Sequence, residues 1–246
     1  MIEGGLAWPS GLILLAAMGI VFLASGVQAI IGMGYGLTAA PLLALLDPVF
    51  VPATTLMVGA VSGLYVAFGE RTKIRWSEVG FGMVGRVTGI VIASVLLAGI
   101  QDTSAFLTLF GLCVGAGVLL SLAGWRMEKN SNTLFSMGTV SGAMGTVTGV
   151  GAPPMAVIYQ DSNPDFARPT LAAFFGIGCV ASVAGLAVIG WIQLLHGWLF
   201  LCLLPAMFAG TWAARAFRIS STGHYRLALL LISGVASVML IVKGLA

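Results

Sequence analysis

Eight apolar segments fill most of this 246-residue chain, and they constrain its fold more than any other feature of the sequence. They cover about residues 11–46, 49–69, 78–100, 104–125, 134–160, 169–190, 197–217 and 226–242. A helix needs about 20 mostly apolar residues to cross a bilayer, and each segment is close to that length or longer. The pattern therefore predicts an all-α polytopic membrane protein.

The scarcity of charge supports the same fold class. Only 8% of the residues are charged and 59% are hydrophobic, whereas a soluble domain carries about 25% charged residues. Such a chain has too few polar side chains to cover a surface that faces water. A soluble enzyme, a disordered chain and a nucleic-acid binder with a basic surface are excluded, and we expect the lipid bilayer, not a nucleic acid, as a partner.

Two of the apolar segments are interrupted by glycines at corresponding places. The first break reads GMGYG at 32–36, and the second reads GVGAPP at 149–154. The residues that follow also resemble each other, DPVFVP at 47–52 and NPDFARP at 163–169. The match predicts two repeats, over residues 1–130 and 131–246, each with a glycine-broken first segment and three spanning helices.

The distribution of Lys and Arg favours segments that fold back at these breaks. If every segment crosses the membrane once, the loop cations divide six against four. If both broken segments fold back, nine lie on one side and only Lys243 lies on the other. The nine are Arg71, Lys73, Arg75, Arg126, Lys129, Arg168, Arg215, Arg218 and Arg226.

Cytoplasmic loops carry an excess of Lys and Arg, so we predict the folded-back arrangement in a multi-pass plasma-membrane protein. It places both termini outside and inverts the two repeats relative to each other. The sequence leaves open whether each break forms a re-entrant hairpin or a pair of short helices.

The residues around the two breaks resemble a known family. GVQAIIGMGYG at 26–36, followed by PLL at 41–43, is similar to the first signature of the TauE/SafE sulfite-exporter family. SGAMG at 141–145, continuing to GVGAPP at 149–154, is similar to the second. The resemblance covers nearly the whole chain. It implies a transporter that exports small anions, such as sulfite, sulfonates or related organosulfur or carboxylate anions.

The breaks themselves suggest how an anion is bound. A helix that begins inside the bilayer leaves its first N–H groups without partners in the helix, and these groups and the helix dipole attract anions. Two breaks would direct two helix starts at one site near the membrane midplane. The residues expected to bind substrate are Gln28, Gly32, Gly34, Tyr35, Gly36, Thr38, Arg86, Thr146, Thr148, Gly149, Gly151 and Pro153. The alternative is that the glycines only permit close helix packing.

Arg86 is the one cation well inside an apolar segment. An arginine there costs several kcal/mol if it faces lipid, so we expect it to face the protein interior or to reach the interface. It either attracts the anion or has a structural role, and both interpretations stay open. We expect Thr54 and Thr55, which follow Pro52, to cap a helix in preference to contacting substrate.

Two other classes of function remain as alternatives. The first is a membrane subunit or sensor that transports nothing. The second, an intramembrane enzyme, is the least supported, because the chain has no HExxH or GxSxG motif and its three cysteines lack metal-ligand spacing. We therefore expect no catalytic residues, metal or cofactor. Small residues at 111–117 allow packing within the chain or between copies in a homo-oligomer.

The folded-back topology is tested by a reporter enzyme that is active only outside the cytoplasm. Fused after Ala246, it is expected to be active, and fused after Lys129 it is expected to be inactive. A cytoplasmic signal from the fusion after Ala246 would contradict the topology.

Overall fold

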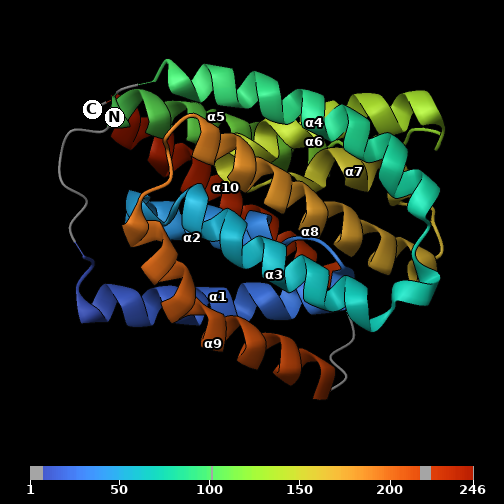
Figure 1. Ribbon diagram of the computed structural model, residues 1–246, viewed down its shortest axis with the longest axis horizontal. Helices are drawn as coiled ribbons and strands as arrows, with labels where there is room; N and C mark the ends of the chain where they lie inside the picture. The colour runs from blue at the N-terminus through green and yellow to red at the C-terminus, as the bar shows by residue number, and fades with distance from the viewer. Residues whose placement is uncertain (1–7, 101, 217–222, 246) are drawn as a thin grey trace.

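The computed structural model describes residues 8–100, 102–216 and 223–245, with side chains in the last stretch described from residue 230 onward. In these ranges the chain is helical and contains no strand, which confirms the predicted fold class (Figure 1). The α-helices are α1 (Gly11–Ile31), α2 (Tyr35–Leu46), α3 (Ala53–Gly69), α4 (Trp76–Ala98), α5 (Thr103–Leu122), α6 (Ser131–Thr148), α7 (Ala152–Tyr159), α8 (Pro164–Val188), α9 (Leu194–Ala216) and α10 (Gly223–Leu245). Short 3-10 helices precede α3 and α4 at Pro48–Phe50 and Arg71–Lys73.

Within the described residues, five helices are long and apolar enough to cross a membrane, namely α1, α4, α5, α8 and α9. The chain is thus a multi-pass membrane protein. Helices α2 and α3 and the stretch Leu230–Leu245 are apolar but shorter. Two of the three spanning helices expected in each half are therefore among these five, and α3, with 17 residues, is slightly shorter than they are.

Each broken segment forms a long helix followed by a short one. Gly32 caps the C-terminal end of α1, Gly34 precedes α2, and Gly149 caps the C-terminal end of α6. These three glycines have φ values of 81°, 105° and 77°, which a residue with a side chain rarely adopts. Helix α2 folds back along α1, and α7 folds back along α6 (Figure 1). Each break thus joins a long helix to a short one, which is neither a pair of short helices nor by itself evidence of a re-entrant hairpin.

Several helices begin earlier than the apolar segments predict, and two of these, α6 and α8, begin at polar caps. Helix α6 begins at Ser131, three residues before the segment, and α8 begins at Pro164, five residues before it. Asn130 and Thr133 form a capping box on α6, and Asn163 accepts a hydrogen bond from the N–H of Asp165 on α8. Capping residues are polar, so a helix start defined by apolarity alone comes too late.

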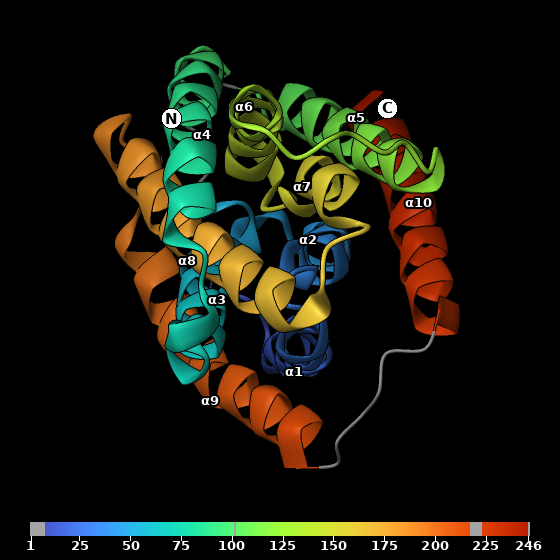
Figure 2. The same ribbon diagram turned by 90° about the vertical axis from the view of Figure 1, so that its right-hand side faces the viewer.

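The principal helix pairs relate the two halves of the chain. Helix α1 packs on α9 and α6 packs on α4, while α3 packs on α8 and α5 packs on α10. If α1 to α5 are exchanged in order with α6 to α10, the same four pairs result. Figure 2 shows the short helices α2 and α7 near the middle, with the longer helices around them. The inversion of the two repeats stays a prediction.

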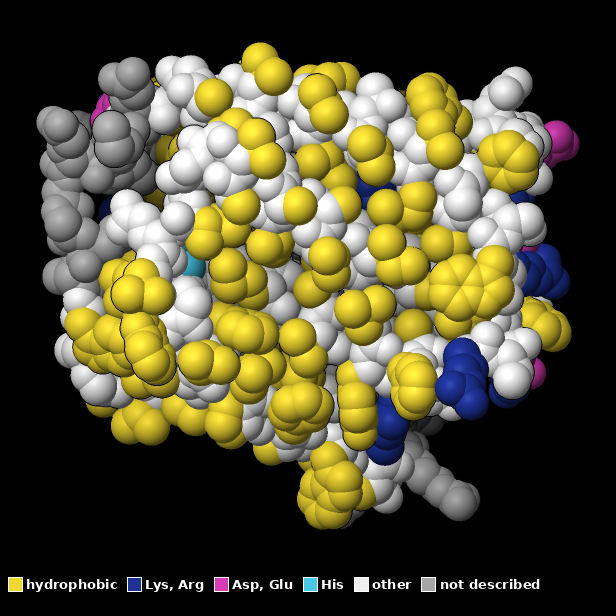
Figure 3. Space-filling model, viewed as in Figure 1, with side chains coloured by type: hydrophobic (Ala, Val, Ile, Leu, Met, Phe, Trp, Pro, Cys, Tyr) yellow, Lys and Arg dark blue, Asp and Glu magenta, His cyan; other side chains and the backbone are white. Residues whose placement is uncertain are grey.

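Cationic side chains gather at one end of the molecule. The connections from α3 to α4 and from α5 to α6 lie at the right in Figure 1, whereas α1 begins and α10 ends at the left. Figure 3 shows Lys and Arg concentrated at the same right-hand end, and hydrophobic side chains over much of the face shown. We call this end, which includes Arg75, Arg126 and Lys129, the cationic end. Arg218 and the side chain of Arg226 lie outside the described residues.

Glycines bring α4 and α6 into backbone contact. A Cβ added to Gly85 or Gly89 would overlap the carbonyl groups of Phe135 or Thr139, and one added to Gly142 would overlap the carbonyl of Arg86. The packing interpretation of the sequence therefore accounts for these glycines. It also accounts for the small residues at 111–117, because Gly111 accepts a hydrogen bond from the hydroxyl of Ser237 on α10 at 2.8 Å.

Substituting Gly89 by Ala is expected to destabilise the protein. Overpacking costs about 1–3 kcal/mol, and each kcal/mol lowers Tm by about 2–4 °C at this chain length. The control is Gly80→Ala on the same helix, where an added Cβ meets nothing within 4 Å. The measurement is thermal unfolding in detergent, and equal Tm values for the two variants would contradict the packing argument.

Candidate functional site

The two glycine breaks meet in the middle of the protein. A Cβ added to Gly36 would overlap the carbonyl of Gly149, so the first turn of α2 touches the second break. A cavity of about 30 Å³ lies between them, and we call it the break cavity. It is lined by Gln28, Gly34, Tyr35, Gly36, Leu37, Thr55, Leu56, Gly59, Arg86, Gly149, Gly151, Ala152, Phe175 and Cys179. Both halves of the chain therefore build it.

Gln28 fixes the first break. Its side-chain amide donates to the carbonyl of Gly32 at 3.1 Å, and its Oε1 accepts from the backbone N–H of Tyr35 at 3.2 Å. Gln28 thereby satisfies the first N–H of α2, one of those that a helix start leaves unpaired. The N–H groups of Gly36 and Leu37 follow in the same turn, and both of these residues line the break cavity.

Hydroxyl groups fix the second break. The hydroxyl of Thr148 accepts from the N–H of Val150 at 2.9 Å and donates to the carbonyl of Met144 at 2.7 Å. The hydroxyl of Ser141 donates to the carbonyl of Gly151 at 2.7 Å. These bonds hold the turn that leads into α7, whose first turn contains Pro153 and Pro154.

Arg86 reaches the break cavity from α4. Its side chain is only 1% exposed, and its Nη1 donates to the hydroxyl of Ser141 at 2.8 Å. Its Cζ lies 5.0 and 5.5 Å from the ring centroids of Phe174 and Phe175. Gly178 leaves room for it, because an added Cβ there would overlap the guanidinium. The side chain therefore faces the protein interior and does not reach the interface.

No carboxylate pairs with this guanidinium among the described residues, and its Nε has no hydrogen-bond partner. A buried charge without a partner of opposite charge costs several kcal/mol. The phenol of Tyr35, which lines the same cavity, also has a buried hydroxyl without a partner. The break cavity thus contains buried hydrogen-bond donors and a net positive charge.

The structure brings together seven of the twelve residues expected to bind substrate. The seven that line the break cavity are Gln28, Gly34, Tyr35, Gly36, Arg86, Gly149 and Gly151. The other five, which lie outside its lining, are Gly32, Thr38, Thr146, Thr148 and Pro153. Gly32 packs against the backbone of Arg168. Thr146 donates to the carbonyl of Gly142 and bonds the hydroxyl of Ser182 at 2.9 Å.

Five lining residues come from helices that contribute no expected site residue. Thr55, Leu56 and Gly59 lie on α3, and Phe175 and Cys179 lie on α8. The hydroxyl of Thr55 donates to the carbonyl of Phe50 at 2.9 Å, so it also supports the turn before α3. No local motif marks these positions, because they reach the cavity through the packing of α3 on α8.

A larger cavity of about 610 Å³ lies beside the break cavity, and we call it the vestibule. Thr38, Ala152 and Pro153 contribute to its wall, and Arg126 and Arg168, from the cationic end, also line it. Gly34 borders both cavities. The vestibule therefore extends from the cationic end to residues that also line the break cavity.

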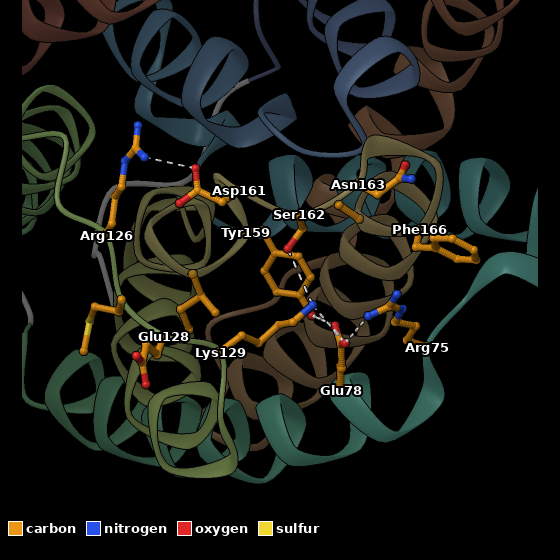
Figure 4. A pocket seen from close by; sticks show the side chains of 13 residues that line it. Arg75, Glu78, Arg126, Glu128, Lys129, Tyr159, Asp161, Ser162, Asn163 and Phe166 are labelled. Carbon is orange, nitrogen blue, oxygen red and sulfur yellow. Dashed lines mark hydrogen bonds and ion pairs between the residues drawn. The ribbon is translucent and has the colours of Figure 1, made fainter.

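A second polar cluster surrounds Glu78 at the cationic end (Figure 4). The Glu78 carboxylate accepts from the hydroxyl of Tyr159 at 2.7 Å and forms ion pairs with Arg75 at 3.1 Å and Lys129 at 3.0 Å. This cluster ties the end of α7 to α4 and to the link between the halves. The pocket there, of about 470 Å³, is lined by three cations and three acids, so it has no excess of positive charge. The break cavity is the better candidate for an anion site.

Gly178→Ala tests whether Arg86 is a ligand of the anion. The added Cβ would displace the guanidinium, and a lost hydrogen bond to a charged group costs about 1.5–3 kcal/mol. We expect sulfite to bind about tenfold more weakly or worse, as measured by isothermal titration calorimetry in detergent. Gly197→Ala, where an added Cβ meets nothing within 4 Å, is the control and should bind normally. Unchanged affinity in Gly178→Ala would argue against Arg86 as a ligand.

Comparison with known families agrees with the resemblance seen at the two breaks. The model of a family described as Sulfite exporter TauE/SafE matches residues 17–240, nearly the whole chain. No curated protein and no solved structure matches the chain. The match runs from α1 to α10 and includes both breaks and Arg86, so the resemblance is confirmed.

Proposed function

Because this chain belongs to the TauE/SafE sulfite exporter family, we propose that it carries sulfite, sulfonates or related small anions out of the cell through the break cavity. Membership implies a membrane exporter of sulfite or similar anions. The proposal adds the site and the substrate range. Like other members of a transporter family, the protein has a small anion and the lipid bilayer as its partners.

One observation carries the proposal, namely a buried guanidinium with no carboxylate partner beside two helix starts. Arg86 lines the same cavity as Gly36 of α2 and Ala152 of α7. The N-terminus of a helix carries a partial positive charge of about half a unit, so all three features favour an anion. An anion in the break cavity would supply the opposite charge that the protein itself does not provide to Arg86.

The donors in the cavity match an oxyanion. Nε of Arg86 and the hydroxyl of Tyr35 are buried without partners, and each can donate to one oxygen. First-turn N–H groups of α2 can donate to another oxygen. A cavity of about 30 Å³ has room for about two water-sized groups, so it must widen to take a sulfite or sulfonate head of one sulfur and three oxygens. The body of a larger sulfonate would extend past Gly34 into the vestibule.

The same arrangement supports export from the cytoplasm. If the cationic end faces the cytoplasm, as the excess of Lys and Arg predicts, the vestibule faces the compartment that holds the substrate. Both termini then lie outside. Release on the opposite side requires the vestibule to close, and α7 is the short element between the vestibule and the Glu78 cluster.

Transport is tested with purified protein in liposomes and a panel of sulfite, short sulfonates and carboxylates. Arg86→Gln is expected to lower sulfite flux by more than about 100-fold, because loss of one partner of a buried charge pair costs about 3–5 kcal/mol. Gly151→Ala should also lower it, since its Cβ would lie 2.9 Å from the carbonyl oxygen of Ser141 and 3.0 Å from Nη1 of Arg86.

Gly80→Ala is the matched control and should transport normally. Tight binding of sulfite without flux would instead favour a sensor or a non-transporting subunit, the main alternative. Flux that is equal in Arg86→Gln and the control would contradict the proposed site.

A further inference from the structure

The surroundings of Arg86 also bear on what the transporter carries in return. The side chains or backbone nearest its guanidinium belong to Ser141, Gly145, Gly151, Phe174, Phe175, Gly178 and Cys179. None of these residues is acidic. The break cavity contains no Asp or Glu among its lining residues.

The nearest acid on the same helix is already engaged. Glu78 precedes Arg86 by eight residues on α4, about 12 Å along the helix axis. Its carboxylate bonds Tyr159 and pairs with Arg75 and Lys129. Leaving those partners to reach Arg86 would expose three donors at once, so Glu78 is a poor internal counterion.

The other partners of Arg86 are neutral. The hydroxyl of Ser141 accepts one hydrogen bond, and the rings of Phe174 and Phe175 offer their π faces. Cation–π contacts weaken the cost of burying a charge but do not cancel the charge. An empty cavity that is sealed from water on both sides would therefore hold a bare positive charge in a medium of low dielectric.

We propose that the protein is an obligate anion exchanger. The site changes sides only when an anion neutralises Arg86, so each anion that leaves is replaced by another small oxyanion carried inward. This inference rests on the proposed function and adds the counter-substrate to it. Among the described acids, none lies in the middle of a spanning helix where it could return a proton in place of the anion.

The test compares two internal solutions in proteoliposomes. One contains potassium sulfite, and the other contains potassium gluconate at a concentration first shown not to compete with sulfite for binding. Valinomycin and equal potassium on both sides hold the membrane potential at zero. We expect uptake of radiolabelled sulfite to be about tenfold faster or more with internal sulfite. Equal initial rates would overturn the exchange mechanism and leave the proposed transport function intact.

Two substitutions connect the result to Arg86. Arg86→Gln removes the charge, so its residual uptake, measured above that of protein-free liposomes, should be equal with the two internal solutions. Arg86→Lys keeps the charge and should keep the difference. A difference that survives in Arg86→Gln would overturn the role of this charge, whereas no uptake by the unmodified protein in either solution would contradict the proposed function itself.

A third variant tests the charge without removing the arginine. Ser141→Asp places a carboxylate where the hydroxyl now lies 2.8 Å from Nη1. This internal counterion should abolish both sulfite binding and the stimulation of uptake by internal sulfite. Full stimulation in this variant would overturn the inference, and Ser136→Asp, an exposed change on the same helix, provides the control.

Discussion

The absence of water in the bilayer core governs this structure, because every backbone group that a helix break exposes there must find a partner in the protein. The chain places its two breaks near the middle of the bundle, where other helices surround them. Gln28 serves the first break, and Ser141 and Thr148 serve the second. The breaks are stable because these few polar side chains pair with the exposed backbone groups. The donors that remain face the break cavity.

This requirement also explains why neither half forms the site alone. Arg86 lies on α4 in the first half, and its partner Ser141 lies on α6 in the second. Glycines let these two helices approach until their backbones touch, so the close packing of α4 and α6 sets the position of the guanidinium. The anion-binding and the helix-packing interpretations of the glycines are therefore compatible. One set of glycines packs helices, and another set, at 34–36 and 149–151, shapes the cavity.

Much of the fold was predictable from the sequence, because apolar length and glycine breaks are local properties. The helix interruptions within 11–46 and 134–160 follow directly from them, whereas the form of each break was left open. Helix starts at Ser131 and Pro164 were missed, since their caps are polar. At the candidate site, Arg86 was identifiable as a cation inside an apolar segment. Its neighbours Phe175 and Cys179 were not identifiable, because they approach Arg86 only through the packing of α8. The residue pattern of a single apolar segment does not predict how that segment packs on others.

The attachment of α7 to α4 has a geometric consequence. At one end Gly151 is joined to Arg86 through Ser141, and at the other Tyr159 is joined to Glu78. Gly151 and Tyr159 are eight residues apart, as are Glu78 and Arg86. The two links therefore have the same spacing on the two segments. A shift of α7 by one helical turn, about 5.4 Å, would break both links together. Movement of α7 along its axis is therefore opposed by bonds at both of its ends.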